Sequence, residues 1–528
     1  MTERIYLSTT IPYVNARPHL GFALELVQAD ALARHHRQRG DLVRFQTGTD
    51  ENSLKNVLAA QAEGVPVREL VRRNAAAFAA LAGPLALSYD DFIQTSSDPR
   101  HLAGAQRLWR ACAERGDLYL KEYQGRYCVG CEQFYREAEL AGGRCPDHGT
   151  AAQLVSERNW FFRLSRYGGP LHDLVSSGRL RVEPAGRRNE VLAFIASGLE
   201  DFSISRSTRR AHGWGIPVPG DPGQVMYVWW DALGNYISAL GYGGQAGEYE
   251  RWWRRGDRRV HLVGKGVLRF HAVYWPAMLL SAGQPLPTDI LVHDYLTTDG
   301  HKISKSGGGT PDPVALVRQF GTDSVRWWLL REVPRAGDTD FTAGRLIARA
   351  NADLADGLGN LVSRTVAMVH RYRAGVVPGG EAVRAGVVPG GEAVRAGAVP
   401  GGGQGRAGDP GAGRLRAACE RAPGLIDAAL GDFDFRAAAD AAWEIVDQAN
   451  RYIEDVRPWQ LARSQDGLAA ARLDAALALL IRACRCLACQ LAPLVPGTAA
   501  RVAAQCTPAG PVGKLPDPEP VFPRLATA

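Results

Sequence analysis

Hydrophobic and polar positions along the first fifty residues follow the order expected of a βαβ unit. Residues 4–10 form a short apolar, β-branched run, which predicts a strand. Residues 22–39 carry apolar side chains at helical spacing and end at Gly40, a residue type that often follows a helix. Residues 42–47 predict a second strand. This order opens a doubly wound parallel sheet, in which ligands bind outside the carboxyl ends of the strands.

The pattern divides the rest of the chain into three parts. A second apolar, aromatic block covers residues 225–275, and residues 289–292 predict another strand. An insertion that contains four potential metal ligands separates this block from the first one. Residues 312–372 and 415–494 are rich in Ala and Arg at helical spacing, which predicts an all-helical carboxyl half.

A direct repeat interrupts the helical half. Eleven residues, RAGVVPGGEAV, occupy 373–383 and recur at 384–394, and RAGAVPGG follows at 395–402. Pro and Gly pairs break helices, which excludes a coiled coil with an eleven-residue period. We therefore expect a flexible surface loop over residues 373–412.

Composition narrows the class of protein only slightly. The 528 residues are 46% hydrophobic and 22% charged, which is ordinary for folded domains and excludes wholesale disorder. At roughly 150 residues per domain, three or four domains are expected. The net charge of +7 permits a nucleic-acid partner without demanding one. The first residues lack a secretory apolar core, and no later segment offers about 18 uninterrupted apolar residues, so we expect a cytoplasmic protein without a membrane partner.

Two short segments carry candidate phosphate-binding chemistry. His19 and Gly21 fall where the first strand passes into the first helix, and free N–H groups at a helix amino terminus suit phosphates. His19 alone fits a capping or packing role equally well. The second segment is Lys302-Ile-Ser-Lys305-Ser, followed by three glycines. The chain has only six lysines, so two ammonium groups beside a Gly-rich loop favour a mobile clamp on a triphosphate over a solvated charge pair.

Together these segments resemble the two signatures of class I aminoacyl-tRNA synthetases, and further blocks in the family's order resemble the methionyl-tRNA synthetase family. The resemblance covers nearly the whole chain except the repeat. The further blocks are Gly48-Thr-Asp50-Glu, Asn159-Trp-Phe-Phe-Arg163, Asp201-Phe-Ser-Ile-Ser-Arg206, Tyr227-Val-Trp229-Trp-Asp-Ala232, His261-Leu-Val-Gly-Lys265, Phe270-His271, Trp275-Pro-Ala-Met278, Gly359-Asn360-Leu-Val-Ser-Arg364, Asn450-Arg-Tyr-Ile453 and Pro458-Trp459.

The resemblance implies a fold, an activity and a set of site residues. The implied fold is α/β, a Rossmann-like doubly wound parallel sheet split by a zinc-containing connective insertion and followed by an all-α anticodon-binding domain. The implied reaction joins L-methionine and ATP, with Mg²⁺, to methionyl-adenylate, and then charges tRNA(Met), including the initiator. His19, Lys302 and Lys305 are the implied catalytic residues, and Gly21 and Lys265 complete the ATP site. The implied methionine-binding residues are Ile11, Tyr13, Asp50, Trp229, Ala232, Tyr236, His271 and Trp275.

Two close pairs of residues in the insertion predict a metal site. Cys128 and Cys131 are three positions apart, as are Cys145 and His148, and this spacing suits one structural, tetrahedral Zn²⁺ ion. Unrelated buried thiols are the alternative. The resembling family carries a zinc knuckle in the same insertion.

Three residues in the helical half match positions that read the CAU anticodon in the family. Asn360 and Arg364 are four apart, so they share a helix face, and Trp459 offers a plane on which a base can stack. Trp459 alone fits a helix-packing residue equally well, and only the match of all three residues favours recognition.

The resemblance also implies domain limits. They are a catalytic domain at 1–115 and 226–296, a connective insertion at 116–225, a signature-loop region at 297–350 and a helical anticodon-binding domain at 351–528. A chain without an evident dimerisation module is expected to be a monomer.

Three positions depart from the family pattern. Phe22 replaces a second histidine, Gly266 replaces an acidic residue beside the nucleotide, and Leu233 replaces a proline beside the pocket. These departures leave open a catalytically weakened tRNA-binding paralogue. Another class I synthetase and an unrelated zinc-containing nucleotidyltransferase also stay open, although the insertion is too short for the large editing domain of the Ile, Val and Leu enzymes.

Overall fold

The computed structural model of the chain describes residues 2–128, 133–135, 137–146, 149–245, 247–298, 301–302, 311–379, 410–509 and 513–526. Most of the predicted repeat loop, 373–412, lies outside these residues. Its predicted ends are corrected, because residue 373 is the last residue of α13 (Asn360–Arg373) and residues 410–412 begin α14 (Pro410–Gly431).

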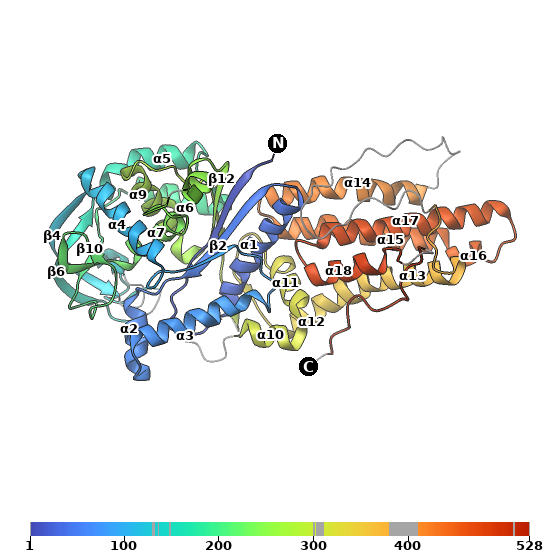
Figure 1. Cartoon of the computed structure of the whole chain (residues 1–528), viewed down its shortest axis with the longest axis horizontal. Coiled ribbons are helices and arrows are strands. Elements are labelled where there is room, and N and C mark those ends of the chain that lie inside the picture. Colours follow the sequence, from blue (N-terminus) through green and yellow to red (C-terminus); the bar gives the residue numbers. More distant parts are fainter. Residues whose placement is uncertain are drawn as a thin grey trace.

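A six-stranded parallel sheet forms the centre of the amino-terminal part (Figure 1). The predicted strands at 4–10, 42–47 and 289–292 are confirmed as β1, β2 and β13, and the helix predicted at 22–39 is confirmed as α1 (Leu20–Gln38). In spatial order the strands are β3 (Asp91–Gln94), β2 (Leu42–Thr49), β1 (Arg4–Thr9), β12 (Arg258–Gly264), β13 (Asp289–His293) and β7 (Arg181–Glu183). Each neighbouring pair is parallel.

Alternation along β1 separates two hydrophobic cores. Ile5 and Leu7 point into a core shared with α1 and with the carboxyl-terminal helices. Tyr6, between them, points into a second core on the opposite face, with α4, α7 and α9. The helices of this part are α2 (Leu54–Glu63), α3 (Val67–Ala79), α4 (Pro99–Glu114), α5 (Gly168–Ser176), α6 (Ala185–Ala196), α7 (Val228–Ser238), α8 (Gly247–Tyr249) and α9 (Trp275–Ser281).

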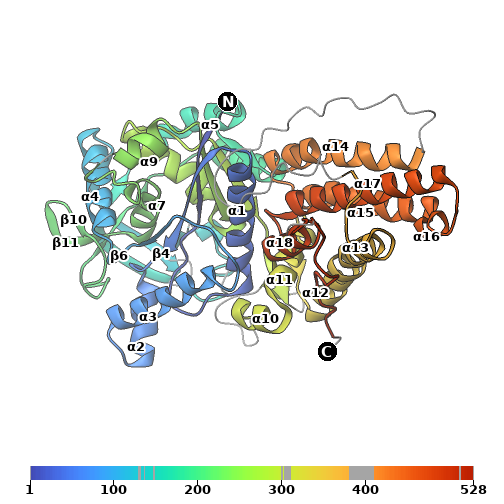
Figure 2. The same cartoon turned by 45° about the vertical axis from the view of Figure 1, so that its right-hand side comes forward.

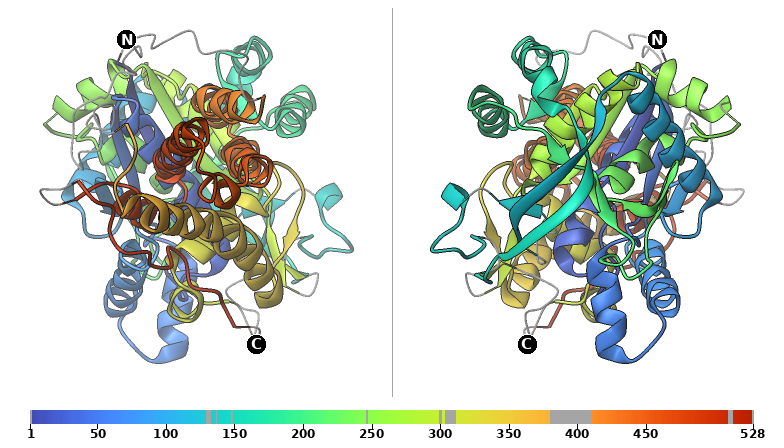
Figure 3. Two further views of the ribbon diagram at one scale, coloured as in Figure 1. Left: turned by 90° about the vertical axis from the view of Figure 1, so that its right-hand side faces the viewer. Right: turned by 90° about the vertical axis from the view of Figure 1, so that its left-hand side faces the viewer.

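The predicted insertion contains a separate antiparallel sheet, seen at the left of Figure 1 and face-on in the right panel of Figure 3. Its strands in spatial order are β5 (Gln133–Tyr135), β4 (Leu118–Cys128), β6 (Gln153–Phe162) and β8 (Phe202–Ser203). A smaller sheet contains β10 (Pro217–Val218), β11 (Asp221–Met226) and β9 (Ser205–Ser207). Residues 116–225 also supply β7, so this segment completes the edge of the main sheet as well.

The carboxyl half is helical, as the periodicity predicts, apart from a small sheet at its start. That sheet joins β15 (His301–Lys302), β14 (Leu296–Thr298) and β16 (Thr339–Asp340). A stretch of wider turns, Ala350–Gly359, connects α12 to α13. The remaining helices are α10 (Pro313–Phe320), α11 (Thr322–Arg331), α12 (Ala343–Arg349), α15 (Phe435–Val456), α16 (Pro458–Leu461), α17 (Gly467–Leu491) and α18 (Pro496–Gln505).

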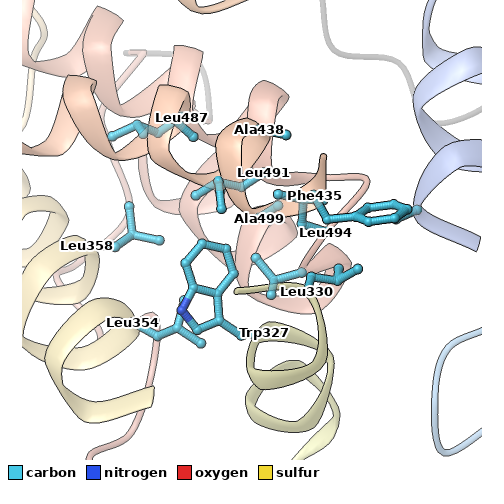
Figure 4. Close-up of a cluster of buried hydrophobic side chains, with 14 of the residues drawn as sticks. Trp327, Leu330, Leu354, Leu358, Phe435, Ala438, Leu487, Leu491, Leu494 and Ala499 are labelled. Carbon is cyan, nitrogen blue, oxygen red and sulfur yellow. The ribbon is translucent and has the colours of Figure 1, made fainter. Parts of the chain in front are cut away.

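A dense apolar cluster joins α11 to the helical bundle, beside which α11 lies in Figure 2; the side chains of the cluster are drawn in Figure 4. Trp327 is fully buried at its centre, and its indole Nε1 donates to Asp353 over 2.9 Å. The surrounding side chains are Leu330, Leu354, Leu358, Phe435, Ala438, Leu487, Leu491, Leu494 and Ala499. Since this cluster belongs to the same core as α1, the bundle is packed directly on the parallel sheet domain. Among the described residues, no helix is long and apolar enough to cross a membrane.

Candidate active site

The β1–α1 connection places His19 at the amino terminus of a long, buried helix. His19 has an extended backbone, and its carbonyl accepts the first helical N–H groups, from Phe22 and Ala23. A Cβ atom on Gly21 would lie 3.1 Å from the His19 imidazole, so glycine lets the ring sit against the first turn. The first N–H groups of a helix and its partial positive charge favour an anion at this edge of the sheet.

Tyr13 and Asp50 meet beside this helix end, as their positions after β1 and β2 predict. The two residues form a parallel β-bridge, and the Asp50 N–H donates to the Pro12 carbonyl over 2.9 Å. Asp50 is 1% exposed. The ring of Tyr13 lies 6.3 Å from that of Trp229, at the start of α7. The structure therefore brings the buried Asp50, Tyr13 and Trp229 together at the carboxyl ends of the strands.

Two further residues predicted for the methionine site, His271 and Tyr236, are joined by a hydrogen bond. The His271 Nδ1 donates to the Val267 carbonyl over 2.8 Å, so its Nε2 accepts from the Tyr236 hydroxyl at 2.7 Å. Burial lowers the pKa of His271 to about 4, and burial also raises the pKa of Tyr236 well above its usual value. Both groups are therefore neutral near pH 7, and they offer a polar but uncharged wall.

Apolar contacts complete the slot. Trp229 stacks on Phe270 with ring centroids 3.7 Å apart. Ile11 and Ala232 belong to a small buried cluster with Ile93. Trp275 is fully buried, and its ring centroid lies 5.9 Å from that of Tyr236.

The lysines predicted for the ATP site differ in how far the structure describes them. Lys265 follows β12, and its Nζ lies 2.5 Å from Asp338 and 4.4 Å from the Tyr295 ring centroid. Lys302 pairs through its backbone with Thr297, while nothing is described of its side chain. Lys305 lies outside the described residues.

The structure describes the surroundings of all three departures from the family pattern. Phe22 is 6% exposed and packs edge-to-face on Phe78 of α3, so it belongs to the core. Gly266 leaves room for a neighbour, because a Cβ there would lie 2.3 Å from the Tyr295 hydroxyl. Leu233 is 2% exposed in the core on the α7 face of the sheet.

The sequence did not predict a buried ion pair between Glu25 and His293. Glu25 of α1 accepts from the N–H and hydroxyl of Thr10 at 2.5 and 2.6 Å, and from His293 Nε2 at 3.0 Å. His293 Nδ1 donates to the Asp294 carbonyl, so both ring nitrogens carry protons. Burial lowers the pKa of His293, but the hydrogen bond and charge of Glu25 outweigh it and raise the pKa above its usual value. Glu25 reads as an ordinary helix position in the sequence, and only the sheet brings His293 to it.

Half of the predicted metal site is described. Cys128 and Cys145 are each 1% exposed and belong to one small cluster of buried side chains. The Cys128 thiol lies 3.8 Å from the Thr150 hydroxyl, and the Cys145 N–H donates to the Thr150 carbonyl. Cys131 and His148 lie outside the described residues, and the described residues alone form no group of three metal ligands.

The predicted anticodon residues lie on two helices of the bundle. Asn360 and Arg364 are on the first turns of α13, and Trp459 is on α16, where it is 37% exposed. In Figures 1 and 2, α16 lies at the end of the bundle that points away from the parallel sheet. An exposed indole at this end is accessible to a partner.

The parallel sheet, the α1 amino terminus at His19 and the Lys-Ile-Ser-Lys-Ser segment are features of a class I aminoacyl-tRNA synthetase. A family model described as "tRNA synthetases class I (M)" matches residues 5–155 and 148–366. The chain is 38% identical to the methionine–tRNA ligase of Brucella suis biovar 1, over 100% of this chain and 99% of that protein. It belongs to the methionyl-tRNA synthetase family.

Other relatives agree over similar lengths. The methionine–tRNA ligase of Thermosynechococcus vestitus is 39% identical over 94% of this chain and 88% of its own. The Mycobacterium tuberculosis methionyl-tRNA synthetase in complex with methionyl-adenylate superposes with a TM-score of 0.88 at 36% identity, covering 99% of this chain and 100% of that one. Its apo form gives a TM-score of 0.82 at 33% identity, covering 100% and 99%.

Proposed function

We propose that this chain is a methionine–tRNA ligase. It activates L-methionine with ATP to methionyl-adenylate and pyrophosphate, and then transfers the methionyl group to the 3′ adenosine of tRNA with a CAU anticodon, the initiator included. The observation that carries the proposal is the buried Asp50, which is bridged through its backbone to Tyr13, whose ring lies 6.3 Å from that of Trp229, at the carboxyl edge of the sheet. The Mycobacterium tuberculosis relative that binds methionyl-adenylate supports it.

In the first step Asp50 holds the ammonium group of methionine by charge. The thioether chain lies among Ile11, Tyr13, Trp229, Ala232, Tyr236, His271 and Trp275, because sulfur packs well against aromatic rings. His271 and Tyr236 are neutral, so the slot accepts an uncharged side chain and disfavours a charged one. The slot and the carboxylate together select methionine.

In the same step the methionine carboxylate oxygen attacks the α-phosphorus of ATP, and the bond to the bridging oxygen of the leaving pyrophosphate breaks. The substrate supplies the nucleophile, so the protein aligns the two substrates and neutralises charge on the departing pyrophosphate. The α1 amino terminus, Gly21, Lys265 and the ammonium groups of Lys302 and Lys305 serve these phosphates, and the His19 imidazole donates to them. Mg²⁺ supplies further neutralisation when it is bound with ATP.

The insertion holds one structural Zn²⁺ through Cys128, Cys131, Cys145 and His148. The burial of Cys128 and Cys145 in one cluster fits this set of ligands. In the bundle Trp459 stacks on an anticodon base, while Asn360 and Arg364 bond base edges. The chain works as a monomer in the cytoplasm on free tRNA, ATP and methionine.

ATP–pyrophosphate exchange with single amino acids tests the proposal. Methionine is expected to stimulate exchange, and Lys305→Arg is expected to reduce it strongly, because guanidinium and ammonium place charge differently. Exchange with Ile or Cys but not Met would identify another class I synthetase, and no exchange with any amino acid would identify a tRNA-binding paralogue. Charging of a CAU-anticodon tRNA separates a synthetase from a nucleotidyltransferase that ignores tRNA.

A further inference from the structure

Helix α7 presents two different faces to the protein. One face carries the slot residues Trp229, Ala232 and Tyr236. The other face carries three polar side chains at the same helical spacing, each 0% exposed: Asp231, Asn235 and Ser238. Buried polar groups need partners, so this second face has to be satisfied by other elements.

His101 of α4 satisfies two of these groups. Its Nδ1 lies 2.8 Å from the Ser238 hydroxyl, and its Nε2 makes a hydrogen bond to Asp231 Oδ1. Serine, histidine and aspartate in contact suggest nucleophilic catalysis. All three are 0% exposed, however, so no substrate reaches Ser238, and the arrangement has to serve the position of α7 instead.

Asn52 continues the chain of hydrogen bonds toward the site. Its Nδ2 donates to the second carboxylate oxygen of Asp231 over 2.6 Å and lies 3.3 Å from the Thr95 carbonyl. Asn52 is two residues beyond Asp50, in the segment that follows β2. A second amide, from Asn56, donates to the Asp50 carbonyl over 3.2 Å. The carboxylate of α7 is thus tied to the segment that carries Asp50.

Asn235 provides a parallel link to β2. Its Oδ1 accepts from Gln46 Nε2 at 2.9 Å, and its Nδ2 donates to the Ala232 carbonyl at 2.6 Å. The rotation of α7 about its axis is therefore fixed from both α4 and β2. Since Trp229 and Ala232 lie on the same helix, this rotation also sets where the slot lies relative to Asp50.

We propose that the hydrogen-bonded residues His101, Asp231 and Asn52 position the methionine-binding residues, and we call these three residues the positioning relay. The relay rests on the proposed function, because it acts through Asp50 and Trp229, and none of its members touches the substrate. It fixes the separation of the ammonium-binding carboxylate from the thioether slot. A binding group displaced by a fraction of an ångström loses most of its contribution, so a buried relay of this kind controls affinity for methionine and not for ATP.

Asp231→Asn tests the relay with minimal change of volume. The new amide has one acceptor oxygen where Asp231 has two, so it cannot accept from both Asn52 Nδ2 and His101 Nε2, and one of these two hydrogen bonds is lost. The dissociation constant of methionine, measured by equilibrium dialysis without ATP, is expected to rise at least tenfold, while the KM for ATP in exchange stays within twofold. Asn52→Asp combined with Asp231→Asn restores a donor opposite an acceptor and is expected to recover part of the affinity.

Ser281→Ala is the matched control, because it removes a buried 2.8 Å hydrogen bond from Ser281 to Asp117 without touching α7. It is expected to leave methionine affinity unchanged. If Asp231→Asn does not fold, the partly buried Asn52→Ala replaces it. An unchanged dissociation constant for methionine overturns the relay, and so does an equal rise in the dissociation constant of methionine and in the KM for ATP. Wild-type protein that does not bind methionine overturns the proposed function, and the two failures are thereby distinguished.

Discussion

The Arg326 guanidinium of α11 is fully buried and lies 2.8 Å from the Asp30 carboxylate of α1. It also donates to the carbonyls of Leu85, Pro493 and Leu494 at 2.9–3.0 Å. Burial raises the pKa of Asp30, but the charges of Arg326 and Arg34 outweigh it and lower the pKa. One side chain therefore joins the first helix of the catalytic domain, the loop after α3 and the helical bundle.

Arg326→Met is expected to be strongly destabilising. It leaves the Asp30 charge without its fully buried partner, and removing one partner of a buried pair costs about 3–5 kcal/mol. Urea unfolding measures the loss. Arg524→Met is the control, because Arg524 and Asp356 form an ion pair with side chains 67% and 52% exposed, for which the loss is below about 1 kcal/mol. Equal losses in the two variants would contradict a structural role for the Arg326 junction.

Asp50→Asn is expected to weaken methionine binding with little effect on folding. The substitution keeps the volume but removes the charge that faces the ammonium group, and truncating one partner of a buried charge pair costs about 2–5 kcal/mol. That corresponds to a rise of about thirtyfold or more in the KM for methionine. Steady-state exchange kinetics measure it. Asp257→Asn, near the opposite ends of the strands where Asp257 accepts from the Arg4 N–H, is expected to leave this KM unchanged.

Because of the Glu25–His293 pair, we expect part of the free energy of unfolding to depend on pH. The folded-state pKa of His293 is raised above its ordinary value. The resulting contribution to the free energy of unfolding is therefore fully present below about pH 6.5, and it is lost as pH rises through the folded-state pKa. Wild type is expected to exceed His293→Gln in free energy of unfolding at about pH 6, and the difference is expected to shrink by about pH 9. His172→Gln is the control, because the His172 side chain is 51% exposed. A difference that does not change with pH would show that His293 carries no extra proton in the folded state.

Metal content tests the proposed knuckle. Replacing Cys128 and Cys145 by Ala is expected to reduce zinc from about one ion per chain to near zero, because two ligands do not hold a structural site. Elemental analysis of the purified protein measures it. Cys112→Ala removes an equally buried thiol on α4 and is expected to leave zinc unchanged. Full zinc content in the double variant would assign the metal to other residues.

Trp459→Ala is expected to separate the two steps of the reaction. Loss of one base–aromatic stack costs about 1–3 kcal/mol, which is roughly a fivefold to more than a hundredfold loss in kcat/KM for tRNA. Methionine-dependent exchange without tRNA should be unchanged. Leu468→Ala, which removes a 74% exposed side chain from the start of α17, is the control for tRNA charging. An equal loss of exchange would instead assign Trp459 to packing of the bundle.

Local signals were enough for the elements that begin the sheet, and long-range contacts account for most of what the sequence did not reveal. The run at 4–10, the periodic helix and the strand at 42–47 each carry their own pattern, and the structure confirms them. β7 is three residues long and becomes a sheet strand only by pairing with β13. His101 and Ser238 are 137 positions apart, so no spacing rule predicts that they touch.

Phe22 marks another limit of pattern reading. When only the motif is considered, the replacement of a histidine by phenylalanine indicates the loss of one phosphate- or ribose-facing group. In the fold the ring packs on Phe78, and the residue gains apolar burial between α1 and α3. Whether a helix position faces the site or the neighbouring helix depends on how the helix is rotated, and the tertiary packing determines that rotation.

The central position of β1 has a consequence for synthesis of the protein. Its first neighbour, β2, begins at Leu42, but its second neighbour, β12, begins only at Arg258. At about 5–20 residues per second, translation leaves one edge of β1 without its partner for roughly 10–50 s. During that interval an apolar strand edge, open to pairing with other chains, is attached to the ribosome. The first strand to be made is thus among the last to be completed, and the nascent chain depends on protection of that edge until the second half of the sheet emerges.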